Sequence, residues 1–122
     1  MNYITAICSA LTPDLLRPRY RGHSDNPMYG HCYVASEALF YLLGGRDQPF
    51  RPCRGKDDTG NVHWWLEDPL SGERLDVTAD QYHSVGKTPP YATGRFGPFL
   101  TKEPSKRERV VIERVKHSTG SA

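Results

Sequence analysis

The sequence lacks any long hydrophobic run: no apolar stretch approaches the roughly twenty residues that cross a bilayer. Its N-terminal residues also lack a basic leader followed by a sustained apolar stretch, so they do not resemble a signal peptide. We therefore expect a cytoplasmic protein with no membrane partner.

Cysteine is scarce, and its spacing is unusual. The three cysteines, Cys8, Cys32 and Cys53, are an odd number 24 and 21 residues apart, which suits neither a disulfide framework nor a CxxC zinc site. At least one must be a free thiol. We expect no metal, because a zinc site of His31, Cys32, His63 and either Cys53 or His23 has no compact ligand pair except His31-Cys32, whose adjacent side chains point about a third of a turn apart on a helix. We also expect no cofactor.

A strong excess of either charge is also missing. The net charge is +2 and the pI is near 8.5, which is too weakly basic to indicate nucleic-acid binding. The one local excess lies between Lys102 and Lys116, where six Lys or Arg residues accompany three Glu residues. We interpret this run as a solvated face and consider a nucleic-acid partner unlikely.

The chain has 122 residues, of which 37% are hydrophobic and 25% charged. These values fit a single domain with one modest core, which we place at residues 1–117. Residues 118–122 are expected to form a disordered tail.

One amphipathic helix is predicted over residues 32–43. Its apolar positions recur every three or four residues and define a single buried stripe, and Gly44-Gly45 then ends the helix. Cys32 lies in the first turn, where unpaired backbone N–H groups and the positive end of the helix dipole stabilise a thiolate.

An antiparallel hairpin is predicted from residues 62–66 and 74–77, with its turn at Ser71-Gly72. Pairing across this turn can bring Asp76, thirteen residues after His63, beside the histidine ring. Glu67 is an alternative partner, because residues four apart on a strand share a face.

The other predicted elements carry weaker signals. A short helix begins at Thr12-Pro13, residues 47–60 form a loop with at most a short strand at Phe50-Arg51, and residues 87–98 form an aromatic loop. Thr78 and Gln81 match a capping box, which predicts a helical turn. Residues 109–115 form either a strand, favoured by their β-branched run, or a helix capped by Ser105 with Glu108 three residues later.

Cys32, His63 and Asp76 occur in the order that a thiol nucleophile, its base and an orienting carboxylate require. Each residue also has an ordinary structural interpretation. The cysteine can be a small core residue, the histidine can pack against its neighbouring tryptophans, and the aspartate can serve a turn. Their joint order and local contexts favour a catalytic triad.

The motifs that carry a family resemblance lie between residues 26 and 82. They are Asn26-Pro27, Gly30-His31-Cys32, His63-Trp64-Trp65, the segment from Ser71 to Thr78, and Gln81-Tyr82. This pattern resembles the YunG-like group of small bacterial and phage proteins and, more loosely, the papain-like and transglutaminase-like cysteine enzymes. The resemblance implies an α+β fold in which a nucleophile-bearing helix packs on a small antiparallel sheet.

The resemblance also implies roles for individual residues. Cys32 corresponds to the nucleophile, His63 to the general base and acid, and Asp76 to the orienting carboxylate. Asn26 is similar in placement to the amide that helps to bind the oxyanion, although it is shorter than the usual glutamine. The Cys32 backbone N–H would be the second oxyanion donor, and His31 is a further candidate.

The expected function is that of a cysteine-dependent hydrolase or acyl-transfer enzyme, such as a peptidase, amidase, deamidase or transglutaminase-like enzyme. Its substrate would be a protein or a small acyl or amide compound. We expect the pocket wall to include Trp65, Gln81, Tyr82 and Tyr91. The alternative is a non-catalytic binding protein or inhibitor of phage or mobile-element origin, built on the same scaffold and directed at a host protein.

Overall fold

The structure is a computed structural model that describes residues 3–12, 15, 31–100 and 104–118. Within these residues the α-helices are α1 (Tyr3–Ala10), α2 (Cys32–Leu42), α3 (Asp80–His83) and α4 (Lys106–Ser118), and the 3-10 turns are η3 (Gly45–Asp47) and η4 (Tyr91–Thr93). The strands are β1 (Arg51–Lys56), β2 (Val62–Glu67), β3 (Arg74–Leu75) and β4 (Arg95–Phe96). None of the described helices has the length and apolar character needed to span a membrane.

The four strands form one antiparallel sheet in the order β3-β2-β1-β4. The predicted hairpin is confirmed: β2 pairs with β3, with Leu66 opposite Leu75 and Glu67 opposite Arg74. Its turn closes through a bond from the Gly72 backbone N–H to the Asp68 carbonyl oxygen at 2.8 Å. Gly72 has a φ of 77°, a conformation that glycine adopts without steric cost.

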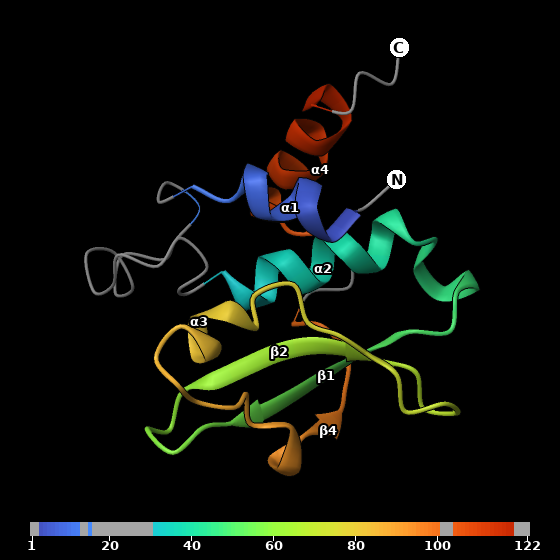
Figure 1. The fold of residues 1–122 in the computed structure, drawn as a ribbon. Coiled ribbons are helices and arrows are strands. Elements are labelled where there is room, and N and C mark those ends of the chain that lie inside the picture. The colour runs from blue at the N-terminus through green and yellow to red at the C-terminus, as the bar shows by residue number, and fades with distance from the viewer. Residues whose placement is uncertain (1–2, 13–14, 16–30, 101–103, 119–122) are drawn as a thin grey trace.

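Three helices cover one face of this sheet, with α2 nearest the strands and α1 and α4 packed above it (Figure 1). The predicted helix from Cys32 is confirmed, and Ala35 and Ala38 are fully buried because their small side chains allow close packing. Along β2, Trp64 contacts Tyr33 of α2 and Leu66 joins the core beneath the helices, whereas Trp65 contacts Tyr91 of η4. The described core contains Ile7, Ala35, Leu39, Leu66, Val111 and Val115.

The expectation of a loop over residues 47–60 is wrong for its middle part, residues 51–56, which form β1. Pro52 and Gly55 disfavour a strand locally, but β1 pairs with β2 over its whole length and also with β4. Gly55 is required by close packing, because a Cβ there would lie 2.6 Å from the Pro90 carbonyl oxygen. The predicted aromatic loop of residues 87–98 likewise contains η4 and β4.

Residues 109–115 lie within α4, so the preferred strand interpretation is wrong and the helical alternative is confirmed. The Ser105 hydroxyl caps this helix by accepting the Glu108 backbone N–H at 3.2 Å. Glu37 of α2 accepts both the Ser105 backbone N–H at 3.2 Å and its hydroxyl at 2.6 Å. Tertiary contacts thus outweigh the β preference of the valines.

Other predictions have mixed outcomes. The helical turn after Thr78 is confirmed as α3. Its predicted cap is wrong, because α3 has no side-chain capping bond and the buried Thr78 hydroxyl has no hydrogen-bond partner in the part of the chain that the structure describes. The helix α1 was not predicted. The predicted helix after Thr12 lies largely outside the described residues. The predicted tail of residues 118–122 also lies outside them, except for Ser118, which is the last residue of α4.

Glu108 is expected to make the folded protein less stable as pH rises. Its side chain is fully buried, and among the described residues neither carboxyl oxygen has a hydrogen-bond partner. Burial, together with the charge of Glu37, raises the pKa of Glu108 to about 7 despite the opposing charge of Arg109. The folded state therefore holds a proton that the unfolded state releases from about pH 4.5 upward, so this contribution declines until the pH passes about 7.

Glu108→Gln is expected to raise the free energy of unfolding at about pH 8 by roughly 1–3 kcal/mol, because no buried charge then forms. Chemical denaturation between about pH 5 and pH 8 measures this effect. Glu113→Gln, on the exposed surface of the same helix, is the matched control and should change stability by less than about 0.5 kcal/mol. Equal pH profiles for wild type and Glu108→Gln would contradict the expectation.

Candidate active site

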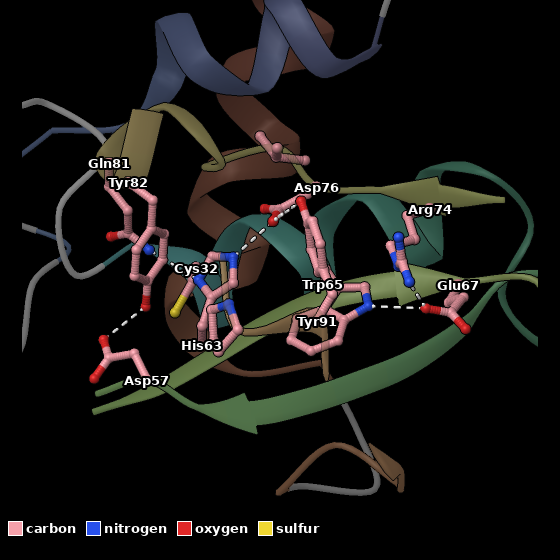
Figure 2. Close-up of polar contacts among 12 residues, drawn as sticks. Cys32, Asp57, His63, Trp65, Glu67, Arg74, Asp76, Gln81, Tyr82 and Tyr91 are labelled. Atoms are coloured by element: carbon pink, nitrogen blue, oxygen red, sulfur yellow. Dashed lines mark hydrogen bonds and ion pairs between the residues drawn. The ribbon is translucent and has the colours of Figure 1, made fainter. Parts of the chain in front are cut away.

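Cys32 is the first residue of α2, and its side chain lies beside β2. The residue is only 9% exposed, and its Sγ atom lies 3.8 Å from the Val62 carbonyl oxygen. The N-terminal end of α2 therefore presents the thiol to the strand that carries His63. Figure 2 shows the sulfur next to the His63 ring.

His63 and Asp76 form a buried pair. The His63 ring is fully buried on β2, and its Nε2 lies 2.7 Å from Asp76 Oδ2 (Figure 2). Asp76 directly follows β3, and its side chain is only 4% exposed. A carboxylate at this nitrogen fixes the ring orientation and leaves Nδ1 as the nitrogen able to exchange a proton with another group.

The pKa of His63 is strongly affected by these neighbours. Burial alone would lower it, but hydrogen bonds with Asp76 and Cys32 and the charges of both groups raise it to about 9. The ring is therefore mainly an imidazolium at neutral pH. An imidazolium beside a thiol stabilises the thiolate form, which is the nucleophilic one.

Aromatic side chains surround the His63 ring. Trp65 stacks on it with centroids 5.8 Å apart, and Tyr82 meets it edge-on at 4.9 Å. The Tyr91 hydroxyl donates to Asp76 Oδ2 at 2.9 Å. Burial and the nearby Asp76 charge raise the pKa of Tyr91, so this hydroxyl keeps its proton and remains a donor. The expected pocket residues thus lie around the histidine, but as close partners of the ring and of Asp76.

Asp57, which was not a candidate, also belongs to this arrangement. The Tyr82 hydroxyl donates to Asp57 Oδ2 at 2.8 Å. Burial opposes ionisation of Asp57, but hydrogen bonds from Thr59, Tyr82 and Asn61 lower its pKa. An Asx-type turn is the only signal in the sequence for Asp57, so its link to Tyr82 could not be foreseen.

Glu67, the alternative orienting residue, has other partners. Its Oε1 accepts from Trp65 Nε1 at 3.3 Å and from Arg74 Nε at 3.1 Å. Arg74 in turn lies over the Tyr91 ring, 4.5 Å from its centroid. Asp76, and not Glu67, is therefore the carboxylate that the structure brings to His63.

The two further oxyanion candidates differ in what can be described. His31 is buried beside Cys32, and its Nε2 lies 2.9 Å from the Thr12 carbonyl oxygen, which ties the start of α2 to the segment after α1. Asn26 lies outside the described residues.

The remaining thiols lie in less favourable surroundings. Burial and the charge of Glu67 raise the pKa of Cys53 to about 11. Burial likewise raises the pKa of Cys8, whose Sγ lies 3.5 Å from the Val77 carbonyl oxygen. In the part of the chain that is described, no three His, Cys, Asp or Glu residues group as potential metal ligands.

Comparison with protein-family models, curated proteins and solved structures finds no match to this chain. The chemical interpretation therefore depends on the geometry around Cys32 and His63.

Proposed function

We propose that this chain is a cysteine-dependent hydrolase or acyl-transfer enzyme of the papain-like and transglutaminase-like type. The observation that carries the proposal is the buried His63–Asp76 pair at 2.7 Å, next to a cysteine at a helix start. Asp76 is the acceptor on one side of the ring, and the Cys32 sulfur lies next to the same ring (Figure 2). A cysteine that only filled space in the core would need neither a histidine beside it nor a carboxylate on that histidine.

In the proposed reaction the Cys32 thiolate attacks a substrate carbonyl carbon, and the carbonyl π electrons move to its oxygen. When the carbonyl re-forms, the bond to the leaving group breaks, and His63 gives that group its Nδ1 proton. The product is a thioester on Cys32. Neutral His63 then takes a proton from water or another acceptor, which attacks the thioester and releases the thiolate.

The backbone N–H of Cys32 is the proposed donor to the developing oxyanion, because the first N–H groups of a helix have no partner within the helix. The buried thiol and its aromatic surroundings favour a narrow acyl or amide group, presented by a small molecule or by a protein side chain.

An activated ester, p-nitrophenyl acetate, tests the proposal directly. We expect acetylation of Cys32, detected as a thioester by peptide mass spectrometry, and release of p-nitrophenol. Cys32→Ser should lose about a hundredfold or more of this rate, because a hydroxyl is far less ionised than a thiol in the same place.

Cys8→Ala is the matched control, since it removes a half-buried thiol that contacts the Val77 carbonyl oxygen, and it should leave the rate unchanged. Equal acetylation of all three cysteines, or full activity in a folded Cys32→Ser variant, would contradict the proposal. A folded protein whose Cys32 reacts no faster than an ordinary thiol would favour the non-catalytic binding protein.

A further inference from the structure

Gln81 contacts the one ring nitrogen of His63 that Asp76 leaves available. Its side-chain Nε2 lies 2.8 Å from His63 Nδ1, while His63 Nε2 lies 2.7 Å from Asp76 Oδ2. The two residues therefore hold the ring from opposite edges (Figure 2). Gln81 projects from α3, a short helix that directly follows the Asp76 segment.

We propose that Gln81 is a positioning residue whose carboxamide holds His63 Nδ1 toward Cys32 in both protonation states of the ring. This inference extends the proposed function, since it concerns the same histidine. It adds a fourth residue to the three that the sequence order identified.

The argument depends on the chemistry of a carboxamide. One end of this group accepts a hydrogen bond and the other donates, and a half-turn about the last side-chain torsion exchanges the two ends with little change in shape. A neutral ring that keeps its proton on Nε2 has an Nδ1 lone pair, which accepts from the Gln81 amide nitrogen. An imidazolium carries N–H on both nitrogens, and its Nδ1–H is then shared between the Cys32 sulfur and the Gln81 amide oxygen.

The cationic ring gains more from this contact than the neutral ring does. A hydrogen bond that involves a charged group is roughly twice as strong as one between neutral groups. Gln81 should therefore favour the imidazolium while still aligning the neutral ring. A side chain that only filled space would favour neither state.

Few titratable groups of the described residues face the ring. Cys32 approaches from α2, Asp76 from the end of β3, and Tyr82 from α3, while Tyr91 of η4 acts through Asp76. Tyr82 is held by Asp57, and burial together with this hydrogen bond raises the pKa of Tyr82, so it stays neutral. Cys32 and Asp76 are thus the ionisable side chains that face the ring from the described residues.

Gln81→Met and Gln81→Glu test the proposal together. The first keeps the length of the side chain without hydrogen bonds, and the second replaces the amide oxygen by a fixed anionic acceptor. NMR titration of the His63 ring nitrogens gives the ring pKa without a substrate. We expect the pKa to fall by about half a unit in Gln81→Met. It should rise by about one unit in Gln81→Glu.

The same titration in a Cys32→Ser background removes the thiol charge, and the order of the three proteins should remain Met, Gln, Glu from lowest to highest. His83→Ala, an exposed change on α3, is the matched control and should leave the His63 pKa unchanged. Equal pKa values for wild type and a folded Gln81→Met variant would overturn the proposal, as would a rise in Gln81→Met. The NMR titration needs no catalytic turnover. A failure to acetylate Cys32 would therefore contradict the proposed enzymatic function but not the proposed role of Gln81.

Discussion

Replacing His63 by alanine is expected to move the midpoint of Cys32 alkylation against pH upward. The reason is that the imidazolium, which persists to about pH 9, is the cation that stabilises the thiolate. The midpoint is the informative quantity, because a thiolate of low pKa is also intrinsically less nucleophilic and the rate at one pH mixes both effects. Alkylation by iodoacetamide, followed by peptide mass spectrometry at Cys32, gives the profile.

Two further variants make this expectation strict. His63→Gln fills more of the buried space and retains a donor for Asp76 but carries no charge, so it should shift the midpoint as His63→Ala does. His83→Ala removes an exposed histidine and should leave the profile unchanged. Coincident profiles for wild type and a folded His63→Gln variant would show that no thiolate–imidazolium pair exists.

The parts of the site that sequence reasoning identified depend on local relations. The helix from Cys32 has a clear apolar stripe, so the thiol could be placed in its first turn. The hairpin fixes the rest, since Leu66 opposite Leu75 continues to place Asp76 opposite Trp65, diagonally across from His63. The turn between β2 and β3 sets this pairing register.

The hairpin register also distinguishes Asp76 from Glu67, the two carboxylates that the sequence offers as partners of His63. Glu67 pairs with Arg74 directly across the hairpin, and opposite charges at such positions attract one another. A carboxylate already satisfied by arginine and by the Trp65 N–H is a poor partner for a histidine. Asp76 has no such neighbour on β3, and its Oδ1 lacks a partner within the described residues.

What could not be predicted depends on contacts between distant segments. β1 contains Pro52 and Gly55, and its stability comes from pairing with β2 and β4. Gly94 shows the same effect at the site, because a Cβ there would lie 2.5 Å from the Trp65 ring. Such close approaches fix where Tyr91 meets Asp76, yet no periodicity in the sequence reports them.

Asp76→Asn is expected to reduce acetylation of Cys32 by roughly a hundredfold to ten-thousandfold. Asparagine has almost the same shape, but it removes the charge that raises the His63 pKa. Its amide nitrogen can also face Nε2, which then accepts a bond and leaves the proton on Nδ1, so that Nδ1 can no longer serve as base. The measurement is kcat/KM for p-nitrophenyl acetate against pH.

The pH profile separates loss of charge from loss of position. Because the Asp76 charge raises the His63 pKa, its removal should move the alkaline limit of acetylation from about pH 9 toward the ordinary histidine value of 6.5. Glu67→Gln removes a charge from the same face of the hairpin, but its partners are Trp65 and Arg74, so the rate should change by less than about threefold. A larger loss in Glu67→Gln than in Asp76→Asn would exchange the roles of the two carboxylates. An unchanged alkaline limit in Asp76→Asn, despite a slower rate, would mean that Asp76 orients the ring without stabilising its charge.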